Sequence, residues 1–253
     1  MIIVNHKLSD EEFVLLDSGY NFGRGVFETI LVKNEPLFLE QHCDRMQKGL
    51  AKLNIQQVIS ANDIKKCIQQ YKIRNCILKV VVTEKNIVIS TRKSTYHSET
   101  YTRGFRIKLS DLKRNPYSHV TYLKSLNYTD NILEKEQAKQ EGYDEVLFLN
   151  VHNEIAEGSI SNVFMGRDGK LYTPEVSCGI LDGIIRKWII ENFEVCEGKF
   201  SIEDIKEADE LFLTNSVMGI MNVNSIKDIK MFQKNEIYES VKNKYEQYIS
   251  QFY

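Results

Sequence analysis

Short strand-like segments alternate with amphipathic helical segments along most of this 253-residue chain. In the first half, residues that favour β structure fall in five runs, at 26–33 (VFETILVK), 36–39 (PLFL), 77–83, 87–91 and 105–109. A helix is expected directly after the second run, because its apolar residues follow one another at spacings of three and four. Another helix is expected behind Asn62. This order predicts an α+β unit.

The second half shows a similar order of segments behind a stretch without periodicity, SDLKRNPYS at 110–118. Helices are expected at 128–141, 183–193 and 237–249, with a short one capped by Ser201, and strands at 145–149, 162–166, 170–172 and 210–213. Two α+β domains fit this length. We predict a smaller N-terminal domain at 1–112, an interdomain loop at 113–121 and a larger C-terminal domain at 122–253.

The charges of the chain are nearly balanced, with 33 Lys+Arg against 35 Asp+Glu, so no strong field attracts nucleic acid or an anionic membrane. No apolar run approaches the roughly 18–20 residues that span a bilayer, and the start, MIIVNHKLSD, lacks the layout of a secretory signal. A cytoplasmic location is therefore expected. The five cysteines and five histidines are scattered without CxxC, HExxH or His-x-His spacing, which argues against a disulfide framework and against a metal site.

Two ionisable residues stand where burial is expected. Lys124 lies in TYLKSLNY, at the edge of a short apolar segment. Burial disfavours an ammonium ion, so such a lysine can act as an amine nucleophile, for example in a Schiff base. Glu157 lies in IAEGSISNVF, at a strand end among small polar residues that can hold a buried acid. From position alone, a solvated strand-end lysine and a turn glutamate are the more common explanations.

Three further features suit an anion such as phosphate. Arg45 lies beside the apolar stripe of its helix, where its guanidinium could reach inwards. Ile184 and Ile185 open a predicted helix, and the free N–H groups of a first helical turn bind anions. Asn215 and Ser216 offer amide and hydroxyl donors at a strand end. A surface charge and ordinary turn chemistry remain alternative interpretations of Arg45 and of this pair.

Six segments follow one another in the order typical of class IV pyridoxal-phosphate enzymes, and the chain resembles that family. The family comprises branched-chain aminotransferases, D-amino-acid aminotransferases and 4-amino-4-deoxychorismate lyases. The resemblance covers about residues 15–225. Its segments are FGRGVFET (22–29), HCDRM (42–46), LKSLNY (123–128), EGSISNVF (157–164), TPEVSCGILDGIIR (173–186) and ADELFLTNS (208–216).

The resemblance implies a fold-type IV enzyme, a homodimer whose pyridoxal 5'-phosphate is held between the two domains. It implies that Lys124 forms the Schiff base with this cofactor and later moves the substrate proton. It also implies that the Glu157 carboxylate keeps the pyridine nitrogen protonated. The other implied cofactor ligands are Arg45, the backbone amides of Ile184 and Ile185, and the Asn215-Ser216 turn for the phosphate, and Tyr128, after a one-residue shift, for the phenolic oxygen.

Within the family, the segments most resemble those of the lyases. The short loop after Lys124 is similar to that of lyases and D-amino-acid aminotransferases, and LTNSVMGI (213–220) is similar to the lyases in particular. VVVTEKNIVIST (80–91) lacks the Arg-x-His of the D-type enzymes. The resemblance thus implies a 4-amino-4-deoxychorismate lyase of folate biosynthesis, which releases 4-aminobenzoate and pyruvate, with Thr29 as candidate proton donor to the departing group. The alternative is a class IV aminotransferase for branched-chain or D-amino acids with a 2-oxo acid acceptor.

Three positions depart from the family pattern. Arg24 stands where the family has an acidic residue, Ile185 where it has a threonine whose hydroxyl could reach phosphate, and VTEK (82–85) where many members have VTRG. These departures leave a third interpretation open, a cofactor-binding or interaction protein on a decayed enzyme scaffold. The retained lysine, glutamate and phosphate arginine favour an enzyme.

Overall fold

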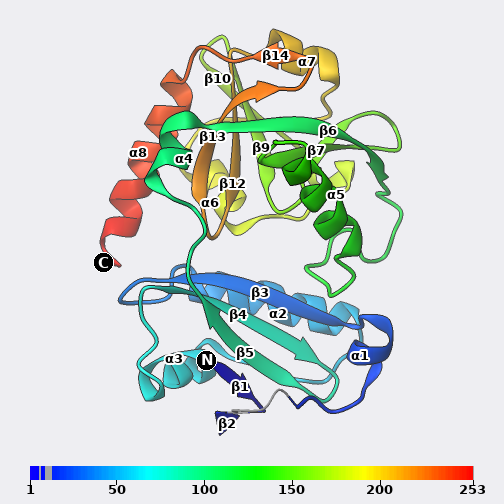
Figure 1. The fold of residues 1–253 in the computed structure, drawn as a ribbon, viewed down its shortest axis with the longest axis vertical. Helices are drawn as coiled ribbons and strands as arrows, with labels where there is room; N and C mark the ends of the chain where they lie inside the picture. Colours follow the sequence, from blue (N-terminus) through cyan, green and yellow to red (C-terminus); the bar gives the residue numbers. More distant parts are fainter. Residues whose placement is uncertain (6, 9–12, 253) are drawn as a thin grey trace. The chain divides into compact units, whose positions relative to one another are not determined.

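The computed structural model of the protein describes residues 1–5, 7–8 and 13–252. The described residues form two compact units (Figure 1). Unit 1 draws on Met1–Thr95, Leu123–Asn127 and Ile249–Tyr253, and unit 2 on Tyr96–Tyr122 and Tyr128–Tyr248. Among the residues described, no helix has the length and apolar character needed to cross a membrane.

Unit 1 is built on an antiparallel sheet with the strand order β2-β1-β5-β4-β3. Its strands are β1 (Ile2–Val4), β2 (Lys7–Leu8), β3 (Gly25–Val32), β4 (Cys76–Thr83) and β5 (Ile87–Arg92). The helices α2 (Leu39–Lys52) and α3 (Ala61–Gln70) cover one face of this sheet (Figure 1). Every second strand residue, such as Val26 and Ile30, is buried against them because strand side chains alternate between faces. The short helix α1 (Ser18–Phe22) leads into β3.

Unit 2 contains a mixed sheet with the order β11-β10-β9-β12-β13-β6-β7-β8, and β14 pairs with β13. The pairs β13–β6, β6–β7 and β10–β11 are parallel. The strands are β6 (Phe105–Arg114), β7 (Glu145–Asn150), β8 (Ile155–Gly158), β9 (Asn162–Arg167), β10 (Lys170–Pro174), β11 (Val195–Gly198), β12 (Glu210–Asn215), β13 (Gly219–Ile226) and β14 (Lys230–Met231).

Both faces of the central part of this sheet are buried. One core cluster gathers Leu147 with residues of β6, β9, β12 and β13. Val146 and Phe148 point to the other face and pack with Ala138 of α5. A strand covered on both faces needs a continuous apolar run, and EVLFL supplies it. The helices are α4 (Ser98–Arg103), α5 (Thr129–Gln140), the 3-10 helix η1 (Val176–Cys178), α6 (Ile184–Asn192), α7 (Ile202–Glu207) and α8 (Glu236–Ser250).

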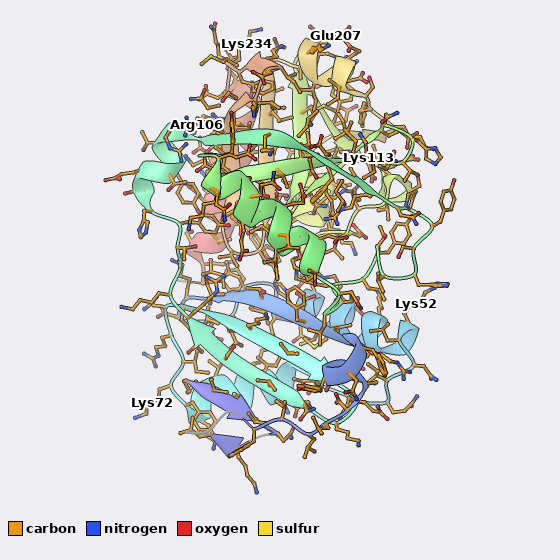
Figure 2. The ribbon with its side chains drawn as sticks, turned by 45° about the vertical axis from the view of Figure 1, so that its right-hand side comes forward. Lys52, Lys72, Arg106, Lys113, Glu207 and Lys234 are labelled. Carbon is orange, nitrogen blue, oxygen red and sulfur yellow. The ribbon has the colours of Figure 1, made fainter. Side chains whose placement is uncertain are left out.

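Many charged side chains lie on the outside of both units, although a few, such as Glu28 and Glu157, are buried. Figure 2 labels six exposed examples, Lys52, Lys72, Arg106, Lys113, Glu207 and Lys234. The apolar side chains of both sheets form the cores of the two units.

Two sequence predictions about single elements were wrong. Residues 36–39 form no strand: Pro36 makes one isolated bridge with Val32, and α2 already begins at Leu39. The stretch 110–118 is not a connection from its start, because β6 continues through Arg114. The register of β6 against β7 shifts between Leu109 and Lys113, which breaks the periodicity that a regular strand shows in sequence. The other predicted helices and strands are confirmed within a few residues. The elements that were not predicted are β1, β2, α1, α4, β8, η1, β11, β13 and β14.

The α+β class with two units is confirmed, but the units divide the chain differently from the expected domains. Residues 96–112 lie in unit 2, where β6 pairs with β7 and β13. Residues 123–127 lie in unit 1. The expected domains at 1–112 and 122–253, joined by a loop at 113–121, stay a prediction.

Arg24, the basic residue in place of the family's acid, has a structural use in unit 1. Its Nε and Nη2 donate to the carbonyl of Leu53 at 3.0 and 2.6 Å, and Nη2 also donates to the carbonyl of Asn54 at 3.2 Å. These carbonyls follow the last turn of α2, whose free C=O groups favour a cation. Arg24 therefore stabilises the C-terminal end of α2.

Candidate active site

Lys124 lies in the segment 123–127, which pairs with the start of β3. The carbonyl of Lys124 accepts the N–H of Phe27 (2.9 Å), and the N–H of Leu126 donates to the carbonyl of Gly25 (3.0 Å). These bonds join residues that are far apart in sequence and fix the backbone of the lysine. The half-buried side chain places its Nζ 4.5 Å from the centroid of the Phe27 ring. An amine at the edge of an apolar segment is thus present at the predicted residue.

The face of the sheet that carries Phe27 also carries a hydroxyl and two cations. Thr29 is two residues along β3, and its partner across β4 is Lys79, whose Nζ lies 4.9 Å from the same Phe27 ring. Arg92 of β5 lies on this face as well. Desolvation lowers the pKa of Lys79 below its ordinary value, and the positive charge of Arg92 lowers it further. This face can therefore bind an anion beside the amine of Lys124.

Glu28 points to the other face of β3 and is fully buried beneath α2. It accepts hydrogen bonds from Nε (2.6 Å) and Nη2 (2.8 Å) of Arg45 and from Nδ1 of His42 (2.7 Å). Burial alone would raise the pKa of Glu28, but the charge of Arg45 and the bonds from both partners hold it well below its ordinary value. The pKa of His42 is lowered overall. Burial lowers it most, the charges of Arg45 and Lys124 lower it further, and the Glu28 carboxylate opposes this shift. His42 is therefore neutral at neutral pH and donates its Nδ1–H to Glu28.

This cluster limits what Arg45 can do. Two of its nitrogens face an internal carboxylate, so its charge is balanced within unit 1 and its orientation is fixed by the forked pairing. The Arg45 side chain is 16% exposed. It can bind a phosphate only with the edge of the guanidinium that Glu28 does not hold, so the predicted role of Arg45 stays a prediction.

Glu157 lies inside β8 and its side chain is buried. Its Oε2 accepts the N–H of Leu181 at 2.9 Å, and its Oε1 lies 3.3 Å from Nη2 of Arg114. An opposite charge and an N–H donor both favour the ionised carboxylate. Because Leu181 stands just before α6, the hydrogen bond also ties Glu157 to the start of that helix. The buried, hydrogen-bonded acid expected at this residue is present, although within a strand.

Tyr128 directly precedes α5, and its hydroxyl donates to the carbonyl of Ser159 at 3.0 Å, two residues beyond Glu157. Nδ2 of Asn131 donates to the same carbonyl at 2.5 Å. A tyrosine hydroxyl has one proton. The predicted bond from Tyr128 to a phenolate oxygen therefore requires this hydroxyl to turn away from Ser159.

Ile184 and Ile185 form the first turn of α6, and the N-cap residue Gly183 has no side chain to cap their N–H groups. A Cβ on Gly183 would lie 1.9 Å from Oδ1 of Asn162, so the close approach of Asn162 requires a glycine here. Nδ2 of Asn162 donates to the carbonyl of Leu181 at 2.7 Å. The amides predicted to bind phosphate thus lie at a helix start that the neighbouring loop holds in place.

Two buried hydroxyls accompany this helix start. Thr214 of β12 pairs with Asn162 of β9, and Ser161 directly precedes Asn162. Within the part of the chain that the structure describes, Oγ1 of Thr214 and Oγ of Ser161 have no hydrogen-bond partner. A buried hydroxyl without a partner costs free energy unless a ligand or water satisfies it. These two atoms are therefore suited to a ligand rich in oxygen acceptors.

Asn215 stabilises the turn after β12. Its Oδ1 accepts the N–H groups of Val217 (2.9 Å) and Met218 (2.8 Å), which is the turn chemistry given above as the alternative. Only the amide N–H groups of Asn215 could donate to an anion. A phosphate contact from Asn215 and Ser216 stays a prediction.

A family model for amino-transferase class IV matches residues 25–226. This span is most of the chain and includes every candidate site residue. The chain belongs to the class IV aminotransferase family. The resemblance read from the six segments is confirmed, and with it the cofactor of the family, pyridoxal 5'-phosphate. The chain is a pyridoxal-phosphate enzyme of the lyase or aminotransferase kind.

Relatives of both kinds are similar to this chain. An aminodeoxychorismate lyase of Bacillus subtilis (strain 168) is 29% identical over 256 residues, covering 90% of this chain and 87% of the relative. A putative branched-chain-amino-acid aminotransferase of Methanocaldococcus jannaschii is 29% identical over 272 residues, covering 96% and 94%. The crystal structure of a putative 4-amino-4-deoxychorismate lyase from Legionella pneumophila has a TM-score of 0.85 at 27% identity, covering 94% of this chain and 96% of that one.

The residues present fit the cofactor. The start of α6 offers N–H groups, and the unpartnered hydroxyls of Thr214 and Ser161 offer donors to a phosphate. The buried carboxylate of Glu157 suits a protonated ring nitrogen, and Lys124 supplies an amine. Unit 2 therefore contains the ring-nitrogen ligand Glu157 and the predicted phosphate ligands of α6 and of the turn after β12. Unit 1 contains Lys124, Thr29 and the predicted phosphate arginine, Arg45.

Several residues that contact or lie beside the candidate site residues were not predicted from the sequence, namely Glu28, His42, Lys79, Arg92, Arg114, Ser161 and Thr214. Lys79 left a signal, as the single charge within the apolar strand CILKVVVT. Arg114 left none, because it stands in the stretch where the strand pattern breaks.

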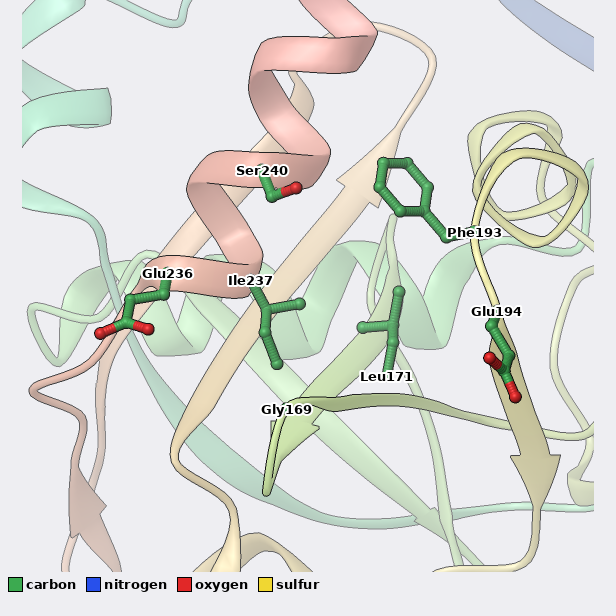
Figure 3. Close-up of a pocket in the computed structure, with 7 residues that line it drawn as sticks. All are labelled: Gly169, Leu171, Phe193, Glu194, Glu236, Ile237 and Ser240. Atoms are coloured by element: carbon green, nitrogen blue, oxygen red, sulfur yellow. The ribbon is translucent and has the colours of Figure 1, made fainter.

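One surface pocket of unit 2 contains none of these residues (Figure 3). Leu171, Phe193 and Ile237 face one another across it, and Glu194 and Glu236 lie to either side, with Gly169 and Ser240 completing the lining. It has no part in the candidate active site.

Proposed function

We propose that this protein is a 4-amino-4-deoxychorismate lyase, which converts its substrate into 4-aminobenzoate and pyruvate. The observation that carries the proposal is the set of cations beside Thr29 on one face of unit 1, Lys79 and Arg92. The substrate of the lyase has two carboxylates, one on the ring and one on the enolpyruvyl group, and each can pair with one of these cations. The similarity to lyases of Bacillus subtilis and Legionella pneumophila supports the same choice.

Each residue has a distinct task in this reaction. Bound pyridoxal phosphate supplies an electron sink for the carbon that bears the substrate amine. Nζ of Lys124 removes the proton from that carbon. Oγ1 of Thr29 donates a proton to the departing enolpyruvyl group, and the ring of the product becomes aromatic. Lys79 and Arg92 hold the carboxylates, which relieves the repulsion between the two cations.

The remaining ligands keep the cofactor in place. Glu157 holds a proton at the ring nitrogen, and the first-turn amides of Ile184 and Ile185 bind the phosphate. Lyase chemistry needs no second substrate. The proposal is tested by mixing cofactor-loaded protein with enzymatically generated aminodeoxychorismate and measuring both products. Equimolar 4-aminobenzoate and pyruvate without any added oxo acid is the expected result.

The alternative is an aminotransferase, favoured by the similarity to the relative from Methanocaldococcus jannaschii. In that reaction Lys124 would carry the proton from the substrate α-carbon back to the cofactor, and a 2-oxo acid would be required. Glutamate formed from branched-chain or D-amino acids with 2-oxoglutarate, and no products from aminodeoxychorismate, would replace the lyase with the aminotransferase.

Lys79→Ala is expected to raise the KM for aminodeoxychorismate about tenfold or more and to change kcat much less, because an ion pair with a substrate carboxylate is lost while Lys124 and Thr29 remain. Steady-state kinetics with product detection measures both constants. Lys66→Ala removes an exposed lysine of α3 and serves as the matched control. An unchanged KM in Lys79→Ala would show that the substrate carboxylates bind elsewhere.

We further propose that the protein is a homodimer and that the segment 13–22 of unit 1 lies in its interface. Six large apolar side chains of this segment are exposed, among them Leu16 at 67% and Phe22 at 77%. The segment is nevertheless held firmly: Asn86 bonds both the N–H and the carbonyl of Leu15, and Asp17 accepts from Thr83. Six exposed apolar side chains on one ordered segment are typical of a contact between proteins.

Leu16→Asp is expected to weaken self-association at least about tenfold, because a charge replaces an apolar side chain at the interface. Sedimentation velocity over a concentration series measures the change. Val58→Asp places the same charge at an equally exposed apolar residue outside the segment, at 70% exposure, and should leave association unchanged. Equal behaviour of the two variants would remove segment 13–22 from the interface.

A further inference from the structure

Arg114, the last residue of β6, turns inwards although its neighbour Lys113 is exposed on the surface (Figure 2). Its guanidinium carbon lies 4.0 Å from the centroid of the Phe148 ring, and its side chain is 12% exposed. A guanidinium stacked on an aromatic ring and removed from water needs anionic or polar partners. Its partners are Glu157, a candidate cofactor ligand, and Asn131, which bonds the same carbonyl as the candidate ligand Tyr128.

One partner of Arg114 is Glu157. Nη2 of Arg114 is 3.3 Å from Oε1 of Glu157, close enough for a strong charge interaction. The alignment falls short of a hydrogen bond, and within the described residues Nη2 and Nε of Arg114 have no hydrogen-bond partner. The pair therefore acts on Glu157 mainly through its charge.

The other partner is Asn131 of α5, whose Oδ1 accepts from Nη1 of Arg114 at 3.2 Å. Nδ2 of Asn131 donates to the carbonyl of Ser159, which also receives the hydroxyl of Tyr128. One arginine thus contacts the proposed ring-nitrogen ligand and, through one amide side chain, the carbonyl that holds Tyr128.

We propose that Arg114 is a positioning residue that keeps Glu157 ionised, so that the proton shared between this carboxylate and the ring nitrogen of the bound cofactor stays on the nitrogen. The inference rests on the proposed role of Glu157. In a dry site, a carboxylate and a pyridinium can become two neutral groups if the proton moves to the carboxylate. The fixed positive charge of Arg114 opposes that transfer because it favours the anion. A protonated ring is the better electron sink, so Arg114 would sustain the reaction without touching the substrate.

The experiment loads the protein with pyridoxal phosphate labelled with ¹⁵N in the ring and records the ¹⁵N resonance. The wild-type resonance is expected at the position of a protonated ring. In Arg114→Met it should move downfield towards the unprotonated ring, because a charge at this distance changes the proton partition by roughly ten- to a thousandfold. Turnover of Arg114→Met should fall at least about tenfold. Arg114→Lys keeps a charge and should stay close to the wild-type resonance.

Arg167→Met is the matched control, since Arg167 also lies over an aromatic ring, Tyr172, and pairs with a carboxylate, Glu207. It should leave the resonance unchanged. Glu157→Gln should abolish the effect of Arg114→Met, because the two residues act as one unit.

The outcomes separate this inference from the proposed function. Bound cofactor whose resonance is the same in wild type and Arg114→Met would overturn the inference alone. Wild-type protein with an unprotonated ring nitrogen would also overturn it, even if Arg114→Met failed to fold. Wild-type protein that takes up no pyridoxal phosphate would overturn the function as well.

Discussion

Lys124→Ala is expected to reduce turnover at least about a thousandfold, because the variant loses both the amine that binds the cofactor covalently and the base that moves the substrate proton. The absorbance band of the lysine-bound cofactor should disappear, while phosphate binding in unit 2 can still retain some cofactor. Stopped assays for 4-aminobenzoate measure turnover, and absorbance spectra report the state of the cofactor.

Two further variants make this test specific. Lys124→Arg keeps a positive charge near Phe27 but has no nucleophilic amine, and it should be as inactive as Lys124→Ala. Lys227→Ala removes a lysine that likewise lies over an aromatic ring, Tyr143, and should be fully active. An active Lys124→Ala with its absorbance band intact would mean that another lysine holds the cofactor.

Glu157→Gln is expected to slow turnover about a hundredfold while the protein still binds pyridoxal phosphate. The amide is similar in shape to the carboxylate, so the N–H of Leu181 can still find an acceptor, but the amide cannot stabilise a protonated ring nitrogen. Product assays give the rate, and titration of cofactor-free protein with pyridoxal phosphate gives the affinity.

The control for this prediction is Glu210→Gln. Glu210 is another buried carboxylate of unit 2, and it accepts the N–H groups of Ile237 (3.0 Å) and Tyr238 (2.8 Å) at the start of α8. Its replacement should lower the melting temperature without slowing the reaction. Equal rates for Glu157→Gln and the wild type would remove Glu157 from the ring nitrogen.

Ile185 stands where the family has a threonine, but the structure offers other hydroxyl donors for the phosphate. The family pattern places a hydroxyl there that could reach the phosphate. In unit 2 the buried hydroxyls of Thr214 and Ser161 lie beside the same helix start and lack a partner among the described residues. Either can supply a donor in place of the missing one, so a weak phosphate site does not follow from Ile185.

The contacts of Arg45 show where single-residue reasoning from sequence reaches its limit. Its place beside the apolar stripe of α2 predicted a side chain that reaches inwards, and it does so. The acceptor it meets is Glu28, which the sequence analysis had not assigned to any site. A helix pattern gives the direction of a side chain, whereas its partner depends on which strand lies beneath the helix.

The sequence by itself determined the local elements and the family. Apolar periodicity predicted α2 and α8 to within a few residues, runs rich in β-branched residues predicted β3, β4 and β5, and six ordered segments identified the class IV enzymes. These features are encoded within a few neighbouring residues, so they can be read without knowing the fold.

Only the tertiary structure decided which distant segments meet. It pairs Lys124 with the start of β3, assigns β6 to unit 2, and brings Arg114 to Glu157. It also shows that PLFL, despite its composition, leads into a helix. These contacts join residues that are tens of positions apart in the sequence, so a pattern among neighbouring residues cannot predict them.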